Sequence, residues 1–419
     1  MPRALVRARL AAALLAVAAM TTACATAPMP TPTPTPSSPS PTPMGDGVLR
    51  IGTLFPSSGG VAFIGAAQVA GVNAAIREIN AAGGVGGVPV EVLNRDSGDA
   101  STQKAEESFA DLVAKGVDVV IGPSSSVLAE RLLGPAAEAG VPLISPAATY
   151  PQLTTADEAG VFSRTIPSYA HQGVALGDLL PAKKAPKVAL VYTNDELGTS
   201  MLETLTASLA EHEGELVGGY PVRTGTDAAA LAAKVKTAAP DAVVLATPDN
   251  GDQTKALIAA LTAAGYGGAK LWLTSQNLAD YSQALPAGLL GGVNGILEGV
   301  QPDDAFIAKL KQEDPGLVDA RYGAEAYDAT ILAALSAVLA GDDGGASIAA
   351  ALRDATRDGI KCSSFGECLD VLRTETDIDY GGITGSVNFD QTGDRTTASY
   401  GLYVYTAENK YQRTESITG

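Results

Sequence analysis

Short apolar strands alternate with Ala-rich helices along most of this 419-residue chain. The alternation begins near Val48 and restarts after Ser168, which gives two similar series. Parallel strands need a crossover helix, so repeated β–α units predict parallel sheets with helices on both faces. We therefore expect an α/β fold of two doubly wound, Rossmann-like lobes joined by hinge crossovers. The expected strands span 49–55, 89–95, 117–121, 141–145, 187–192, 215–221, 242–246 and 270–273, and the expected helices span 66–82, 102–115, 199–213, 227–238 and 253–264.

The pattern changes after Gly295. A long helix is expected over 322–339 and a shorter one near 346–357, followed by strands at 385–389 and 399–405. Helices that follow the second series are expected to return and cover the first lobe. The predicted organisation is therefore discontinuous, with 47–168 plus about 297–385 in the first lobe and 169–296 plus about 386–419 in the second.

The first 46 residues predict export and anchoring rather than a folded domain. Residues 1–23 join a basic start to an apolar run too short for a lasting membrane span, as in a signal peptide. Cys24 follows a small residue, as in a bacterial lipobox, although Thr21 stands where Leu is usual. Residues 24–46 hold this cysteine and a Pro/Thr-rich tether that cannot bury a core. We expect a lipidated Cys24 on the outer face of the cell membrane; an ordinary signal peptide cut nearby is the alternative.

Composition excludes several function classes. The chain has 28 basic and 46 acidic residues and a formal net charge of −18, which argues against a nucleic-acid partner. Its two histidines, His171 and His212, lie in no ligand-like cluster, so we expect no metal and no cofactor. The glycines at 83–87 lie between a helix and a strand and indicate a turn rather than a phosphate loop.

Two cysteines remain besides Cys24. Cys362 and Cys368 are six positions apart, so the segment between them must loop if they pair. In an exported protein this spacing predicts a disulfide that closes a small surface loop, whereas two sulfurs without histidines make a weak metal site.

The segment 117–149 predicts a binding site. One strand breaks at Gly122-Pro123 into three serines that open an amphipathic helix, and the next breaks at Pro146 into Ala147, Ala148 and Thr149. A helix start offers unpaired N–H groups and the positive end of its dipole, and strand ends of this kind line the ligand crevice of doubly wound sheets. We expect a small anionic group to bind here, with Ser126 as the best-placed hydroxyl; simple helix capping is the alternative for one of the serines.

Several segments in order resemble the type I periplasmic binding proteins, specifically the branched-chain amino acid and amide-type receptors of ABC importers. They are RIGTLFPSSGG, VVIGPSSS, VPLISPAAT, VALVYTNDELG and GITGSVNFDQTGDR, and the resemblance covers about residues 48–408. The family implies a ligand held between two lobes that close by hinge bending, and a closed form that docks on a membrane permease.

The resemblance also assigns ligand-binding positions. In the first lobe Ser126, Ala147 and Thr149 match the carboxylate-binding elements, while Ile64, beside Phe63, matches a contact to the ligand side chain. In the second lobe Leu197 falls where an aromatic residue is common, Asn250 falls in another cleft loop, and Gln276 falls where an acidic residue pairs with the ligand ammonium. An amide supplies only a neutral acceptor, so Gln276 predicts an altered ammonium half unless Asp195, Glu196 or Asp249 supplies the charge.

The sequence thus predicts a monomeric, extracytoplasmic substrate-binding lipoprotein of an ABC importer, with a small carboxylate-bearing ligand and permease subunits as partners. Branched-chain and other amino acids, amides and aromatic acids all stay open as ligands. An extracellular sensor lobe that reports to a signalling protein is the first rival. A secreted hydrolase is the second, and the absence of a nucleophile–base motif argues against any enzyme.

Overall fold

The computed structural model describes residues 45–58, 62–157, 159–247 and 251–418. The signal peptide, Cys24, most of the tether and Asn250 therefore lie outside the described residues. The side chain of Phe63 also lies outside them, although its backbone belongs to a described helix.

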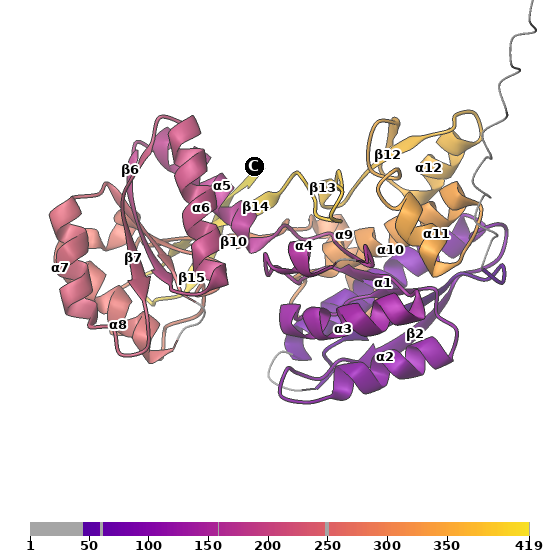
Figure 1. Cartoon of the computed structure of the whole chain (residues 1–419), viewed down its shortest axis with the longest axis horizontal. Coiled ribbons are helices and arrows are strands. Elements are labelled where there is room, and N and C mark those ends of the chain that lie inside the picture. Colours follow the sequence, from indigo (N-terminus) through magenta and orange to yellow (C-terminus); the bar gives the residue numbers. More distant parts are fainter. Residues whose placement is uncertain (1–44, 59–61, 158, 248–250, 419) are drawn as a thin grey trace, which may run out of the picture. The chain divides into compact units, whose positions relative to one another are not determined.

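The first lobe is built on a five-stranded parallel sheet in the order β2-β1-β3-β4-β5. One face packs against α1, and the other packs against α2 and α3 (Figure 1). Four strands and three helices fall close to their expected positions, whereas β5 was not expected. The elements are β1 Arg50–Phe55, α1 Ala62–Ala81, β2 Glu91–Asp96, α2 Lys104–Ala114, β3 Val119–Ile121, α3 Ser126–Ala139, β4 Leu143–Ser145, the short α4 Leu153–Ala156 and β5 Phe162–Arg164.

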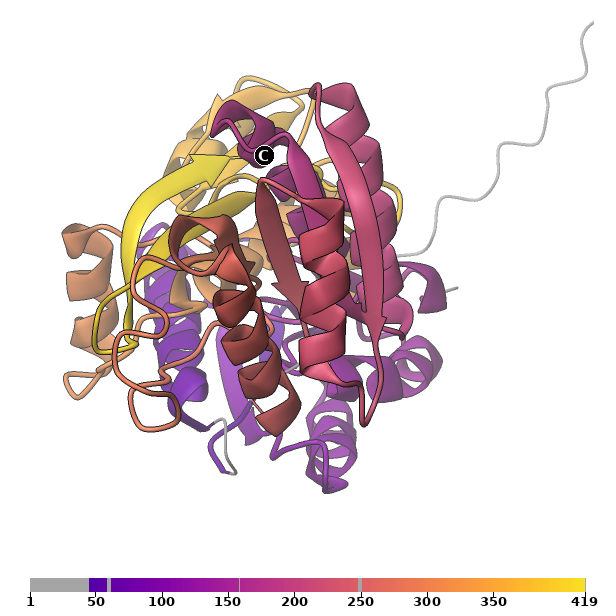
Figure 2. The same ribbon diagram turned by 90° about the vertical axis from the view of Figure 1, so that its left-hand side faces the viewer.

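The second lobe is built on a seven-stranded sheet in the order β15-β14-β10-β9-β8-β6-β7. Its first five strands along the chain are parallel, and the two C-terminal strands, yellow in Figure 2, add to one edge in antiparallel fashion. The expected α/β fold is therefore confirmed, while α5, β10 and β15 were not anticipated. The elements are α5 Tyr169–Ala182, β6 Lys187–Thr193, α6 Glu196–Glu211, β7 Glu215–Val222, α7 Ala228–Ala238, β8 Ala242–Ala246, α8 Asp252–Leu261, β9 Leu271–Leu273, β10 Asn294–Glu298, β14 Ser399–Tyr405 and β15 Tyr411–Thr418.

The chain returns to the first lobe after β10, as expected. Helix α10 (Gly323–Ala340) packs on α1, and Gly71 lets the two backbones approach, because a Cβ there would lie 2.1 Å from the carbonyl oxygen of Gly323. Among the described helices, α10 alone is long and apolar enough to cross a membrane, but 83% of it is buried inside the protein, so we assign it to the core. The other elements of this return are α9 Asp304–Glu313, α11 Gly345–Ala351, β11 Ile360–Cys362, α12 Phe365–Leu372, β12 Ile378–Gly382 and β13 Gly385–Ser386.

Two expected elements are shorter than predicted. The helix near 346–357 ends at Ala351, and the strand expected over 385–389 ends at Ser386. Asn388 has a left-handed backbone (φ 46°), which a strand does not allow. The boundaries expected at 168, 297 and 385 stay predictions.

The predicted disulfide is present. Cys362 and Cys368 are joined with their Cα atoms 5.2 Å apart, and the bond links the end of β11 to α12. Both cysteines are buried in the core that α1 and α10 share. The loop between the two cysteines is thus packed at both ends against the core of the first lobe.

Three crossovers connect the two sheets within one compact unit, Pro43–Gly419: residues 165–168 between β5 and α5, 299–303 between β10 and α9, and 387–398 between β13 and β14. The crossovers bind one another: the Arg395 guanidinium donates to the Thr165 carbonyl oxygen at 2.6 Å, and the Gly299 N–H donates to the Ser399 carbonyl oxygen at 2.9 Å. The Glu325 side chain accepts the Val300 N–H at 3.3 Å. These bonds make the crossovers one connected element.

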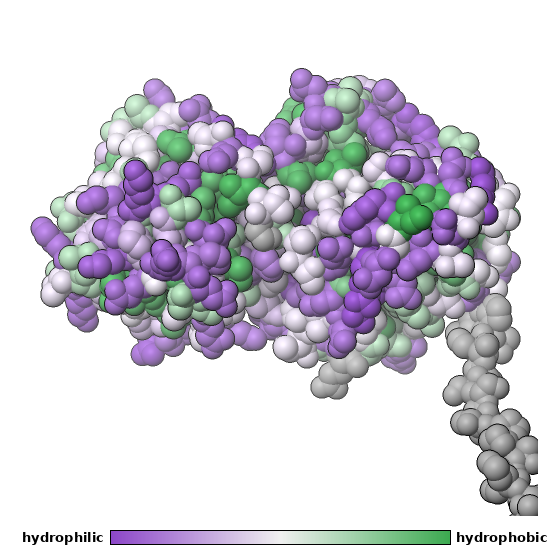
Figure 3. Space-filling view, turned by 90° about the horizontal axis from the view of Figure 1, so that it is seen from above, coloured by the Kyte–Doolittle hydropathy of each residue, from purple (hydrophilic) through white to green (hydrophobic). Residues whose placement is uncertain are grey.

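Hydrophilic residues cover most of the face seen in Figure 3, and hydrophobic residues appear there in small separate groups. Large apolar side chains collect instead in clusters on the two faces of each sheet. The cores therefore position the strand ends, where the candidate site lies.

Candidate functional site

Three successive serines after β3 have three different roles. Ser125 caps α3, since its side chain accepts the Leu128 N–H. Ser124 donates at 2.6 Å to Oε1 of Gln68, a fully buried residue of α1 whose amide also donates to the Ile64 carbonyl oxygen. Gln68 therefore ties the start of α1 to the loop after β3. Sequence reasoning missed this role, because the pairing joins residues 56 positions apart.

Ser126 joins the helix start to the loop that follows β4. Its Oγ accepts the N–H of Thr149 at 3.0 Å and the N–H of Tyr150 at 3.2 Å. The N–H groups of Ala147 and Ala148 donate to Ser145 Oγ at 3.3 and 2.9 Å. The loop amides are thus bound to serines. Between described residues, no hydrogen bond uses the Ser126 hydroxyl hydrogen or the Thr149 hydroxyl, so both groups can bind a ligand.

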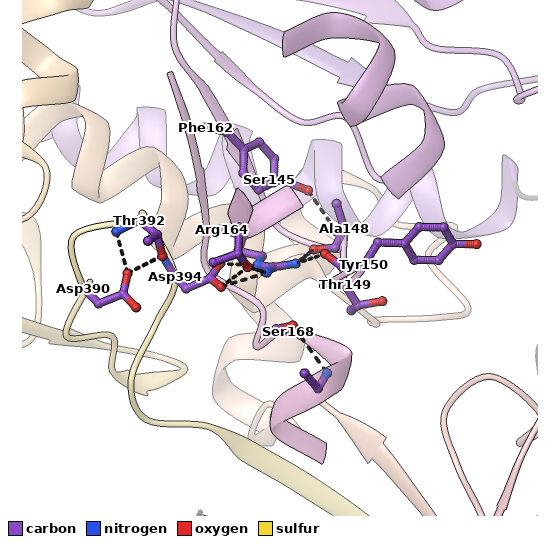
Figure 4. A network of polar contacts seen from close by, with 12 residues as sticks. Ser145, Ala148, Thr149, Tyr150, Phe162, Arg164, Ser168, Asp390, Thr392 and Asp394 are labelled. Atoms are coloured by element: carbon purple, nitrogen blue, oxygen red, sulfur yellow. Dashed lines mark hydrogen bonds and ion pairs between the residues drawn. The ribbon is translucent and has the colours of Figure 1, made fainter. Parts of the chain in front are cut away.

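A buried arginine holds the same loop from behind. The Arg164 guanidinium, at the end of β5, donates to the carbonyl oxygens of Ala148 at 3.2 Å and Tyr150 at 2.8 Å (Figure 4). It also forms a two-pronged ion pair with Asp394, at 2.5 Å from Nε and 2.8 Å from Nη2. The side chain is fully buried, so the carboxylate must offset the cost of burying its charge. Arg164 therefore positions the loop without facing a ligand.

These elements surround a cavity of about 450 Å³. It brings together three of the predicted site residues, Ile64, Ser126 and Ala147, whereas Thr149, whose N–H donates to Ser126 Oγ, is not among its lining residues. A volume of this size suits a small ligand. The remaining lining residues come from β1, the loop after β2, the start of α3 and the position before α10: Pro56, Ser97, Gly98, Asp99, Ala100, Ser124, Ser125, Val127, Tyr150 and Tyr322.

The cavity can receive an anion through neutral donors. Among the described residues that line the cavity there is no Lys or Arg, and no hydrogen bond between described residues uses the N–H groups of Ser126 and Val127. Hydrogen bonds from Ser101 lower the pKa of Asp99. The ionised Asp99 carboxylate sets a negative charge at one side of the cavity, which favours a ligand that also carries a positive group.

Tyr322 is a site residue that sequence reasoning missed. It precedes α10 with a left-handed backbone (φ 61°), a conformation that is costly for a bulky residue, and it lines the cavity. It also lines a second cavity of about 360 Å³ beside the crossover from β10 to α9. The sequence offered one signal for it: Tyr322 stands at the start of the long helix predicted over 322–339.

The candidate residues of the second lobe do not line one common cavity. Leu197 is 8% exposed and packs in the core between the sheet and α5 and α6, and Gln276 is half-buried in the turn after β9. Asp195 caps α6, since its Oδ1 accepts the Gly198 N–H at 2.9 Å, and Glu196 is exposed. Neither carboxylate lines the 450 Å³ cavity. The assignment of ligand contacts to this lobe stays a prediction.

Comparison with known proteins identifies the family. The family model described as periplasmic binding protein matches residues 48–408. This chain belongs to the periplasmic binding protein family. The family consists of binding proteins, which agrees with the expectation that this chain is not an enzyme, and it places the chain outside the cytoplasm.

Three proteins that are similar to this chain differ in their named roles and ligands. The chemotactic signal transduction system substrate-binding protein BasB of Halobacterium salinarum is 26% identical, covering 81% of this chain and 82% of its own. An ABC transporter substrate-binding protein from Desulfitobacterium hafniense in complex with Leu has a TM-score of 0.65 at 20% identity, covering 88% of this chain and all of that one. A solute-binding protein of an ABC transporter from R. palustris in complex with 4-hydroxybenzoate has a TM-score of 0.62 at 20% identity, covering 88% and 97%.

Proposed function

We propose that this chain is the substrate-binding component of an ABC importer for a small carboxylate-bearing solute. The observation that carries the proposal is the cavity at the start of α3. Ser126, Ala147 and Ile64 line it, and the uncharged N–H groups at the start of α3 can donate to a bound anion. In this proposal the ligand carboxylate binds the free N–H groups and hydroxyls of the first lobe. The ligand then bridges to the second lobe, around Gln276, and shifts the hinge equilibrium toward a closed form.

We further propose that closure presents a docking surface to the permease subunits. Lipidated Cys24 and the Pro/Thr-rich tether would hold the monomeric protein at the outer face of the membrane. Support for this comes from the composition of residues 1–46 and from the family's place outside the cytoplasm.

A ligand screen tests the binding step. Purified protein lacking residues 1–46 is heated with single amino acids, amides, alkanoic acids and aromatic acids, and the melting temperature is recorded. A ligand at 100 times its Kd stabilises the folded state by about 2.7 kcal/mol, which raises the melting temperature by several degrees. If none of these compounds raises it, the proposal is wrong.

A sensory role is the second candidate, and the similarity to BasB favours it. Co-purification from membranes separates the two. An importer component should retain permease and ATPase subunits in the presence of ligand, whereas a sensor should retain a signalling receptor. Uptake of the radiolabelled ligand, lost on deletion of this gene, would decide for the importer.

A further inference from the structure

Gln68 is a polar residue on the buried face of α1. Its side chain is 0% exposed, and the buried residues that flank it in the helix, Ala67, Ala70 and Val72, are apolar. Burying an amide costs free energy unless it forms hydrogen bonds, and an apolar residue at this position would pack without that cost. A satisfied polar pair in a core specifies one arrangement of the elements that it joins. The amide of Gln68 therefore indicates that the place of α1 is fixed for a reason beyond packing.

The two ends of this amide bind two walls of the 450 Å³ cavity. Oε1 accepts the Ser124 hydroxyl at 2.6 Å, and Nε2 donates to the Ile64 carbonyl oxygen at 3.2 Å. Ser124 and Ile64 both line the cavity, whereas Gln68 is not among the described residues that line it. Gln68 thus acts on the cavity from behind, through the residues that it joins.

A close backbone contact fixes the same part of α1. A Cβ added at Gly65 would overlap the carbonyl oxygen of Pro56, which is another residue that lines the cavity. The first two turns of α1 are therefore held at two points, Gly65 against Pro56 and Gln68 against Ser124. Ile64 is next to the first point and bonded to the second, so these two contacts together determine where it lies.

The residues that Gln68 joins belong to two chemically different walls. Ser124 lies in the loop that opens α3, where N–H groups can bind the carboxylate of a ligand, and Ile64 offers an apolar surface to the rest of that ligand. The bond between Gln68 and Ser124 therefore fixes the distance from the carboxylate position to the apolar wall. A pocket with a fixed apolar wall distinguishes ligands that differ by one methylene group by about 10- to 200-fold.

We propose that Gln68 is a positioning residue that sets the length of the ligand that the cavity accepts. The inference rests on the proposed function and adds a determinant of selectivity that touches no ligand atom. The bond to Ser124 carries this role, because it joins α1 to another element, whereas the bond to Ile64 stays within the helix.

Three series of carboxylates, each lengthened by one methylene group at a time, test the inference. They are butanoate to hexanoate; valine, leucine and homoleucine; and benzoate, phenylacetate and 3-phenylpropanoate. Calorimetry gives the Kd of each compound for the wild type and for Gln68→Met, which replaces the amide by an apolar chain of similar length. In a series that binds, the wild type should prefer one length over the next by about tenfold or more. Gln68→Met should reduce this ratio to about threefold or less.

A control variant separates positioning from stability. At the other end of α1, Asn80 Oδ1 accepts the Val90 N–H at 2.7 Å, and Asn80 Nδ2 donates to the Val90 carbonyl oxygen at 3.1 Å. Asn80→Leu removes this comparable pair of bonds. It should lower the melting temperature and leave the ratio of Kd values unchanged.

Ser124→Ala breaks the bond to Gln68 from its other partner and carries the test if Gln68→Met does not fold. It should reduce the length preference to the same extent. In the double variant with Gln68→Met the ratio should change by less than about a further twofold, because the two single changes remove one shared bond.

The outcomes are distinct. An unchanged ratio in Gln68→Met overturns the inference, because a purely structural role weakens the binding of all lengths alike. An equal change in Asn80→Leu also overturns it, as does a wild type that binds successive members of a series with equal affinity; the proposed function then still stands. If the wild type binds no carboxylate of any series, the proposed function itself fails, and the inference fails with it.

Discussion

At the residue scale, single side chains hold the loop after β4 in place. The loop after β4 is fixed from one side by Ser126 and from the other by Arg164. Neither contact depends on neighbours in sequence, because the serine opens α3 and the arginine ends β5. The loop is therefore ordered without a ligand, which under the proposed function would lower the entropy cost of binding.

Replacing Ser126 with Ala should reduce ligand affinity about 10- to 100-fold, because two loop N–H groups lose their acceptor and the ligand loses a hydroxyl. Calorimetry with a ligand found in the screen measures this. Ser364→Ala is the matched control: Ser364 caps α12 away from the site, so its loss should cost about 1 kcal/mol of stability and leave affinity unchanged. Unchanged affinity in Ser126→Ala would refute the assignment.

Replacing Arg164 with Met should lower the free energy of unfolding by about 3–5 kcal/mol, because it leaves the largely buried Asp394 carboxylate without its partner. Urea unfolding measures the loss. Arg373→Met breaks the exposed pair with Asp370 and should cost at most about 1 kcal/mol. Similar costs for the two variants would show that the buried pair contributes little.

At the element scale, the three crossovers determine how the lobes are joined. Gly299 follows β10 with a positive φ of 99°, and a Cβ added there would lie 2.7 Å from Glu325 Oε1. The position therefore demands glycine for two reasons, the backbone conformation and the close approach of a carboxylate. The carboxylate is in turn held by the Val300 N–H of the same crossover.

Gly299→Ala should destabilise the protein more than Gly225→Ala does. Both positions have a positive φ, but nothing lies within 4 Å of a Cβ at Gly225, so that variant reports only the backbone cost of about 1–2 kcal/mol. The additional loss of unfolding free energy in Gly299→Ala measures the cost of displacing the Glu325 carboxylate. Equal unfolding free energies in urea would mean that the crossover adjusts without strain.

At the scale of the whole molecule, buried carboxyls link stability to pH. Burial raises the pKa of Asp118, Glu298 and Glu325 to about 7, above their ordinary values near 4. Between about pH 4 and pH 7 the folded state binds more protons at these carboxyls than the unfolded state does. Their contribution to the free energy of unfolding is therefore present at low pH and is lost as the pH rises through 7. His171 opposes it, since burial lowers its pKa and costs stability as the pH falls below its ordinary 6.5.

Burial also raises the pKa of Asp328, so four buried carboxyls oppose one histidine, and the melting temperature should be higher at pH 5.5 than at pH 7.5. Each carboxyl contributes at most about 1.4 kcal/mol per pH unit within this window. The double variant Glu298→Gln, Glu325→Gln should flatten the dependence, whereas changing the exposed Glu196 to Gln should not. A wild-type melting temperature that rises with pH across this window would contradict the account.

The sequence by itself determined the α/β class, most strands and helices of both series, the disulfide and the serine-rich helix start. These features have local signals: apolar periodicity, capping residues and cysteine spacing act over a few neighbouring positions. The expected residues Ser126 and Ala147 line one cavity because strand ends of a parallel sheet meet at one edge, whereas Ile64 in α1, which also lines it, was expected only from the family resemblance.

Only the tertiary structure decided the rest. It brought Arg164 to Asp394, Gln68 to Ser124 and Glu298 to Ser275 across 230, 56 and 23 positions. Such pairs leave no periodic trace, because each depends on which strand ends lie side by side after packing. The segment 117–149 predicted which strand ends would form the candidate site, whereas the contacts of Gln68 and Arg164 that hold this site together depend on how α1 and β5 pack.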